Sequence, residues 1–159
     1  MLQWRLARFD ELTPHQLYLL MRLRQDVFVV EQKCAYPDLD GSDFPSLHLS
    51  AWRDDQAVAY LRVIPPEAHK SGCPSLGRIC TSLEVRRTGV GRELVQRGLD
   101  LVTAHWPGKD CQIGAQAYLV RFYEGFGFKI NGEGYDEDDI PHFPMRWYAT
   151  NDPAQRKSQ

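Results

Sequence analysis

The segment at residues 86–92, RRTGVGR, contains the residue types that bind a phosphate group. Glycines at positions 89 and 91 stand just before an amphipathic run and let a ligand approach the bare backbone. The first turn of a helix exposes about four unbonded N–H groups and a partial positive charge, so it attracts anions. Three arginines add full positive charges: Arg86, Arg87 and Arg92. The segment predicts a pyrophosphate-binding turn; the alternative is a plain tight turn with solvated arginines.

Two familiar phosphate motifs are excluded. The dinucleotide pattern GxGxxG fails because Leu94 stands at the position of the third glycine. The pattern GxxxxGK[ST] of nucleotide-hydrolysing proteins is absent. The turn at residues 86–92 therefore predicts a different kind of phosphate ligand.

A second segment, AQAYLVRFYEGFGF from Ala115, predicts a short helix at residues 118–126 that Gly127 closes. Its apolar side chains recur at i, i+3, i+4 and i+7: Leu119, Phe122, Tyr123 and Phe126. The ordered pair Arg-x-x-Gly-x-Gly and, about 30 residues later, Tyr-x-x-x-Gly-Phe resembles the GNAT N-acetyltransferase family. The sequences RLRQDVFVVEQKCAYPDLDGSD (22–43) and YDEDDIPH (135–142) resemble its ElaA-type branch. The resemblance covers most of the chain and implies acetyl-CoA as co-substrate.

The resemblance also implies roles for single residues. The backbone of the turn would wrap the coenzyme A pyrophosphate: Arg86, Arg87, Thr88, Gly89, Val90, Gly91 and Arg92. The strand before it would pair with the pantetheine arm and direct a backbone N–H at the acetyl carbonyl as an oxyanion donor: Ile79, Cys80 and Thr81. Gln116 stands where many members have an asparagine on the pantetheine arm. Tyr123 matches the acid that protonates the leaving thiolate, with core packing as its alternative.

The proton acceptor for the attacking amine is open. Many members carry a glutamate early in the strand before the glycine turn, where this chain has Ser75. Glu31 and His142 are the candidates, with His48 a weaker one. Arg24 interrupts the apolar stripe of the first helix and Glu31 continues it, so the two could bracket a site. Alternatively Arg24 extends to solvent, Glu31 caps the loop, and both histidines are structural.

Two acidic segments are candidates for recruiting a cationic acceptor. Asp40 and Asp43 form the first, and Glu137, Asp138 and Asp139 form the second. If both faced one cleft, they would attract an amine, with Arg24 beside the first pair. Solvated loops are the alternative for both segments.

The hydrophobic pattern predicts one domain over residues 1–150 and a flexible tail at 151–159. Strands are expected at 2–8, 48–54, 57–64, 75–85, 112–115, 128–135 and 142–149, and helices at 13–30, 90–106 and 118–126. Thr13 and Pro14 form a helix start, and Asp54-Asp55 forms a hairpin turn. The strand–helix–strand unit at 76–116 predicts one parallel pair. The fold class is therefore α/β (α+β), a mixed, mostly antiparallel sheet with helices on both faces.

Composition excludes several classes of protein. The 159 residues carry a formal net charge of −2, which gives no basic excess for a nucleic-acid partner. No apolar run approaches the roughly 18 residues of a membrane helix, and the first residues lack the apolar core of a signal peptide. The four cysteines form no CxxC pair, so no metal is predicted. We expect a cytoplasmic monomer or homodimer.

The leading functional prediction is transfer of an acetyl group from acetyl-CoA to a primary amine of a small molecule or peptide, by direct attack in a ternary complex. The first alternative is a coenzyme A-binding regulatory module without catalysis. The second is an acyltransferase like the acyl-homoserine-lactone synthases, because Arg24-x-x-x-Phe28 followed by Asp40 and Asp43 resembles their N-terminal part.

Overall fold

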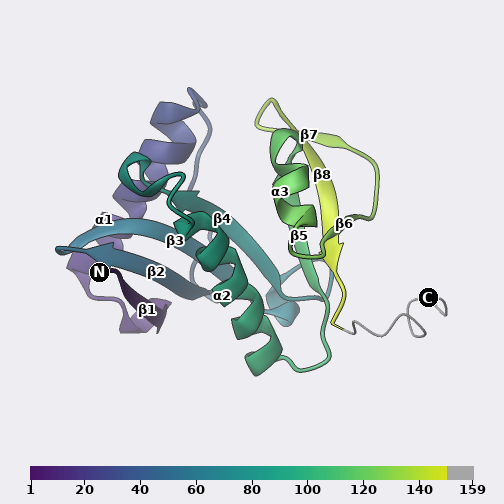
Figure 1. Cartoon of the computed structure of the whole chain (residues 1–159), viewed down its shortest axis with the longest axis horizontal. Helices are drawn as coiled ribbons and strands as arrows, with labels where there is room; N and C mark the ends of the chain where they lie inside the picture. The colour runs from purple at the N-terminus through teal and green to yellow at the C-terminus, as the bar shows by residue number, and fades with distance from the viewer. Residues whose placement is uncertain (150–159) are drawn as a thin grey trace.

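The computed structural model, which describes residues 1–149, contains one eight-stranded sheet in the order β1-β2-β3-β4-β5-β8-β6, with β7 also paired to β8 (Figure 1). The strands are β1 (Gln3–Arg8), β2 (Leu47–Arg53), β3 (Gln56–Ile64), β4 (Ser75–Thr81), β5 (Cys111–Gln116), β6 (Lys129–Ile130), β7 (Tyr135–Glu137) and β8 (Ile140–Trp147). All pairs are antiparallel except β4 with β5. The predicted fold class is confirmed. The predicted tail at 151–159 lies outside the described residues.

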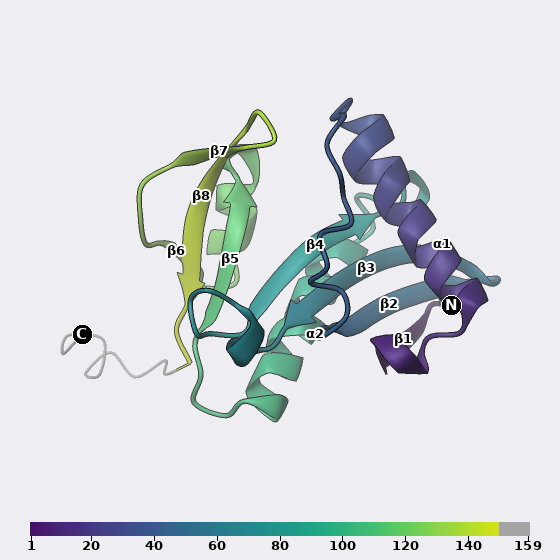
Figure 2. The same cartoon turned by 180° about the vertical axis from the view of Figure 1, so that it is seen from behind.

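Helices cover both faces of the sheet. The main ones are α1 (Pro14–Arg24), α2 (Val90–His105) and α3 (Val120–Glu124). Figures 1 and 2 show α2 and α1 on opposite faces of β2–β4. Under α2 the core holds Leu61, Leu94 and Val95, all fully buried. Under α1 a second cluster includes Leu20 and Tyr60. Because β3 is covered on both sides, its residues from Val58 to Ile64 form an unbroken buried run.

The first helix begins where the sequence predicts and ends differently. The Thr13 Oγ1 atom accepts a hydrogen bond from the Gln16 N–H at 3.1 Å, and the Gln16 side chain accepts one from the Thr13 N–H at 3.0 Å. Such a capping box stabilises a helix by about 1 kcal/mol. The helix continues beyond α1 as a π-helical segment, η2 (Gln25–Glu31). Its wider turn rotates Glu31 away from the face that 3.6-residue spacing predicts.

The strands β4 and β5 diverge after a single contact, and this divergence creates the site. The predicted parallel pair exists, but only Ser75 and Gln112 are in register. A register shift in the β3–β4 ladder lies opposite Arg78, whose φ of 50° is left-handed. Such a bulge bends a strand. Figure 2 shows the two strands separating toward their carboxyl ends.

Several predicted boundaries are wrong, each for a local reason. The strand expected at 75–85 ends at Thr81, because residues Leu83–Val85 form a 3₁₀ turn. The helix expected at 118–126 divides into a 3₁₀ turn (Ala117–Leu119) and α3. The strand expected at 128–135 is reduced to β6, because a glycine-rich segment at 131–134 interrupts it. Residues from 135 onward pair back on β8, which starts at Ile140 rather than 142.

Candidate active site

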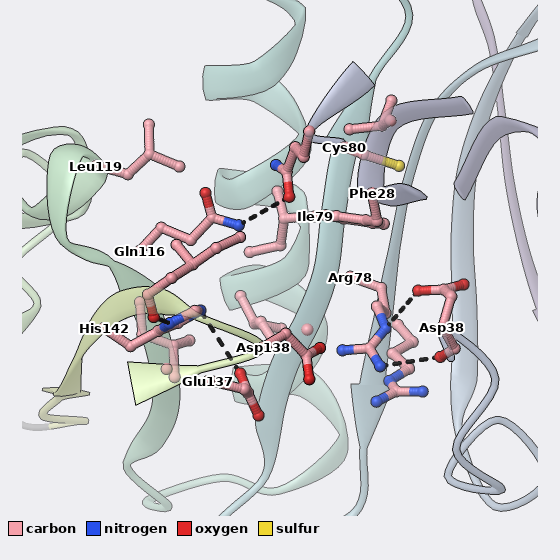
Figure 3. Close-up of a pocket in the computed structure, with 18 of the residues that line it drawn as sticks. Phe28, Asp38, Arg78, Ile79, Cys80, Gln116, Leu119, Glu137, Asp138 and His142 are labelled. Carbon is pink, nitrogen blue, oxygen red and sulfur yellow. Dashed lines mark hydrogen bonds and ion pairs between the residues drawn. The ribbon is translucent and has the colours of Figure 1, made fainter. Parts of the chain in front are cut away.

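A cavity of about 630 Å³ lies between the separated parts of β4 and β5 (Figure 3). Its walls come from η2 and the loop after it, from β4, β5 and α3, and from the β7–β8 hairpin. The sequence-predicted residues that line it are Glu31, Ile79, Cys80, Thr81, Arg86, Gly91, Gln116, Tyr123, Glu137, Asp138 and His142. Segments far apart in the chain thus converge on one space.

The other predicted residues lie outside the lining. They are Arg24, Asp40, Asp43, Arg87, Thr88, Gly89, Val90 and Arg92, together with His48 and Asp139. Those between 87 and 92 form the turn at the rim of the cavity, whereas the first three belong to a buried ion cluster described below.

The glycine turn has the backbone of an anion site. Arg87 has a φ of 62° and Gly89 a φ of 90°, so two left-handed residues curl the chain immediately before α2. No side chain caps the first N–H groups of α2. Arg87 and Arg92 are exposed and form no ion pair with residues 1–149. The left-handed φ of Gly89 favours glycine at that position. A Cβ at Gly91 would meet only the Thr81 methyl, at an ordinary 3.9 Å, and the bare backbone of Gly91 lines the cavity.

Tyr123 lies at the cavity wall and is 6% exposed. Burial raises the pKa of the Tyr123 phenol well above its ordinary value of 10.0. The phenol therefore keeps its proton at neutral pH. Its ring packs edge-on against Phe122 and Phe128, which fixes its direction. On the opposite wall of the cavity, burial also raises the pKa of Cys80, to about 12, so this thiol is no nucleophile.

Glu31 and Arg86 form an ion pair across the cavity wall. Arg86 Nη1 lies 2.9 Å from Glu31 Oε1, and Arg86 Nη2 donates to the Thr81 carbonyl at 3.0 Å. The π-helical turn brings Glu31 to this position. The guanidinium thus occupies a Glu31 oxygen that would otherwise be open to a substrate N–H. Nearby, Gln116 donates to the Gln32 side chain at 3.3 Å.

His142 enters the cavity from β8 with one nitrogen committed. Its Nδ1 atom lies 2.6 Å from the Ile140 carbonyl, and its Nε2 atom lies 3.5 Å from Glu137 Oε2. The Tyr135 ring stacks on the imidazole, with centroids 5.5 Å apart and planes at 20°. Figure 3 shows His142 and Glu137 facing each other on one side of the cavity, with Asp138 close by.

The first acidic segment is neutralised inside the protein. Asp43 accepts from Arg24 at 2.7 Å and from Arg62 at 3.0 Å. Asp40 accepts from Arg62 at 2.7 and 2.6 Å. Arg24 is fully buried and Arg62 is 4% exposed. This geometry differs from the expectation that Arg24, Asp40 and Asp43 face the acceptor, because the arginine that Asp40 binds comes from β3 and cannot be inferred from local sequence.

Asp38 and Arg78 complete this cluster, and no sequence pattern marked either of them. Asp38 binds Arg24 Nε and Arg78 Nε, both at 2.8 Å. His48 is also enclosed: it bonds the Tyr60 hydroxyl at 2.7 Å and the Asp43 carbonyl at 2.9 Å, so it is structural rather than a base. Burial lowers the pKa of His48 below 6.5.

Three aromatic residues of the cavity were not predicted from the sequence. Phe28, Tyr36 and Tyr135 line the cavity, although the motifs that contain them assigned none of them a role in the site. Tyr135 occupies the space over Gly114, where an added Cβ would lie too close to its hydroxyl. A glycine in the middle of a strand was the one available indication that something approaches there.

Two further findings concern only residues 1–149. No three His, Cys, Asp or Glu side chains there are placed to hold a metal ion. None of the helices in that part of the chain is long and apolar enough to cross a membrane.

Comparison with known proteins identifies the fold and the family. A family model described as an acetyltransferase (GNAT) domain matches residues 26–149. Protein ElaA of Escherichia coli is 41% identical over 91% of this chain and 95% of its own length. The crystal structure of an acyl-CoA N-acyltransferase from Pseudomonas aeruginosa, 42% identical, covers 92% of this chain and 99% of that one with a TM-score of 0.88. The CoA-dependent acyl-homoserine lactone synthase BjaI shares only the fold, at 14% identity, 95% and 85% coverage and a TM-score of 0.77.

The fold is therefore that of the acyl-CoA N-acyltransferases. Within that class the chain belongs to the GNAT acetyltransferase family, as its glycine turn and its Tyr-x-x-x-Gly-Phe segment predict, and it is similar to ElaA.

Proposed function

We propose that this protein transfers an acetyl group from acetyl-CoA to a primary amine of a small molecule or peptide. The observation that carries the proposal is the cavity between β4 and β5, which joins the glycine turn at one end to Tyr123 and His142. The uncapped first turn of α2 and the exposed Arg87 and Arg92 suit the pyrophosphate of coenzyme A. The unpaired edge of β4 after Ser75 offers backbone groups to the pantetheine arm.

The proposed reaction is a direct attack. The amine nitrogen bonds to the acetyl carbon, a backbone N–H among Ile79–Thr81 stabilises the oxyanion, and the C–S bond then breaks. Tyr123 gives its proton to the departing sulfur. An ammonium must lose two protons to become an amide: one leaves before the attack, and the second replaces the proton that Tyr123 donated. No protein nucleophile is needed.

The first proton needs an acceptor, and the two sequence candidates differ in structure. Glu31 is held by Arg86 at 2.9 Å. His142 has an Nε2 atom that faces the cavity without a hydrogen bond to residues 1–149. We therefore place the proton acceptor at His142 and give Glu31 the role of holding Arg86.

The test measures thiol release from acetyl-CoA with n-butylamine, benzylamine, cadaverine and a lysine-containing tetrapeptide as acceptors. Loss of a general acid costs about 10²–10⁴-fold in rate, so Tyr123→Phe should lower kcat by at least about a hundredfold while the KM for acetyl-CoA stays similar. Tyr18→Phe, on the exposed side of α1, is the matched control.

Three results would contradict the proposal. A Tyr123→Phe enzyme within about twofold of the wild-type rate would reduce Tyr123 to a packing residue. Binding of acetyl-CoA without turnover of any amine would favour the regulatory-module alternative. Acylation of S-adenosylmethionine would instead favour the acyl-homoserine-lactone-type alternative.

A further inference from the structure

The contact between His142 and the Ile140 carbonyl on β8 determines which ring nitrogen carries the proton. A backbone carbonyl can only accept, so the 2.6 Å contact between Nδ1 and the Ile140 oxygen requires the proton on Nδ1. In neutral His142 the Nε2 atom then carries a lone pair. The Tyr135 ring, stacked on the imidazole, keeps that lone pair pointed in one direction.

Two hydrogen-bond acceptors therefore face each other. Glu137 Oε2 lies 3.5 Å from Nε2, and neither group can donate to the other while His142 is neutral. The separation exceeds the 2.7–2.9 Å or so of a charge-assisted hydrogen bond. Among residues 1–149, Glu137 forms no ion pair with a lysine or arginine. A lone pair beside an uncompensated carboxylate is the arrangement that binds a cationic N–H donor.

The position of the pair suits an acceptor substrate. The His142 side chain is 8% exposed and that of Glu137 is 58% exposed, so the imidazole lies inside the cavity and the carboxylate at its opening. Asp138, in the adjoining turn, also lines the cavity and adds negative charge. Figure 3 shows these groups on the wall opposite Arg78 and Asp38.

We propose that Glu137 and His142 form the binding subsite for the ammonium group of the acceptor. This inference rests on the proposed function and deepens it, because it restricts the acceptor to amines that arrive as unhindered cations. The ammonium donates one N–H to Glu137 and a second to His142 Nε2. The ammonium proton that points at Nε2 then passes to the imidazole, and Glu137 stabilises the resulting imidazolium. The neutral amine nitrogen attacks the acetyl carbon. The imidazolium returns its proton to solvent.

The experiment observes His142 directly and needs no turnover. Protein labelled with ¹⁵N in its histidines is examined by NMR at pH 7.5, with the His142 signals identified by comparison with His142→Gln. We expect neutral His142 with its proton on Nδ1. Titration with n-butylammonium chloride should shift the Nε2 signal saturably, whereas isobutanol should not.

Two charge-neutralising variants on one strand separate binding from bulk charge. Glu137→Gln should weaken n-butylammonium binding about tenfold, the effect expected for a hydrogen bond to a charged group. Asp136→Asn removes the same charge from the neighbouring residue, which does not line the cavity, and should change binding less than twofold. In acetyl transfer, Glu137→Gln should raise the KM for the amine and leave the KM for acetyl-CoA unchanged.

Each contrary result is distinct. A proton on Nε2, a doubly protonated ring in the free protein, or equal ammonium binding by Glu137→Gln and the wild type would overturn the subsite. Saturable ammonium binding without any binding of acetyl-CoA would keep the subsite and defeat the acetyltransferase proposal. Binding of acetyl-CoA without ammonium binding would overturn the subsite and leave the acetyltransferase proposal standing.

Discussion

Two acidic segments lie on opposite sides of the cavity, and they differ in what neutralises them. The segment containing Asp38, Asp40 and Asp43 is bound by arginines from α1, β3 and β4. The segment containing Glu137 and Asp138 has no arginine or lysine paired to it within residues 1–149. Their sequences look alike, yet one ties the loop after η2 to the sheet and the other leaves negative charge at the cavity. An acidic sequence alone therefore does not show whether a segment is structural or binds a ligand. The presence or absence of a paired arginine distinguishes the two.

The largest expected effect comes from breaking the neutralised segment. Asp43→Ala leaves the guanidinium groups of Arg24 and Arg62 buried without one of their carboxylates. Breaking a buried ion pair costs about 3–5 kcal/mol, which for a domain of this size lowers the melting temperature by roughly 6–20 °C. Thermal unfolding followed by circular dichroism measures it. Asp10→Ala removes an exposed partner of Arg8 and serves as the control, with a change of about 0–1 kcal/mol. Equal losses of stability in Asp43→Ala and Asp10→Ala would contradict a structural role for the buried ion cluster.

Acid should weaken the same segment in two stages. Burial lowers the pKa of His48 below 6.5, so the unfolded chain takes up that proton first and stability falls as the pH drops below about 6.5. Burial by itself would raise the pKa of Asp40, but Arg62 and Arg78 lower it to about 2. Its contribution is present above pH 3.8 and is lost as the pH falls toward 2. Melting temperatures between pH 8 and 2 measure both stages, and His48→Gln should flatten the first. An unchanged slope would contradict the neutral, buried state of His48.

The unpaired segment should respond in function and not in stability. Replacing both Glu137 and Asp138 by their amides should raise the KM for a cationic amine by about 10–30-fold, because hydrogen-bonded charges at an opening contribute modestly. The melting temperature should stay within about 2 °C of the wild type. Steady-state thiol release and a thermal melt provide the two readouts. A large loss of stability would show that this hairpin is structural as well.

The smallest expected effect is the response of the two acidic segments to salt, which screens exposed charges more than buried ones. Raising the ionic strength from 0.05 to 0.5 M should weaken amine binding by about two- to threefold, because the carboxylate at the opening is exposed to salt. The buried cluster should be nearly insensitive, since salt screens buried pairs much less. Amine KM values and melting temperatures over this range test both statements. A salt-sensitive melting temperature with a salt-insensitive KM would reverse the roles of the two segments.

Local rules predicted the parts of the fold that depend on a few neighbouring residues. The Thr13–Pro14 helix start, the hairpin turn at Asp54–Asp55 and the glycine turn just before α2 all follow from the chemistry of adjacent positions. Ile79–Thr81 and Tyr123, which line the cavity, were predicted as site residues from the family resemblance and not from local rules. Chain-wide periodicity also gave the mixed sheet and its parallel pair.

What local rules could not predict depends on partners distant in the chain. Arg62 lies 22 residues from Asp40, so no spacing rule connects them. The π-helical turn that moves Glu31 toward Arg86 has no recognised sequence pattern. The Glu137–His142 pair depends on a hairpin turn at Asp138 and Asp139, both left-handed, that a run of acidic residues did not reveal.

The most direct test of the account is whether the cavity between β4 and β5 binds acetyl-CoA. A ligand at 100 times its Kd adds roughly 2.7 kcal/mol to stability. For this chain the melting temperature should therefore rise by about 5–10 °C. The rise should disappear when Gly89 and Gly91 are both replaced by valine, and it should persist in Gly108→Val, which strains a left-handed glycine beyond the far end of α2. No rise at millimolar acetyl-CoA would contradict the account.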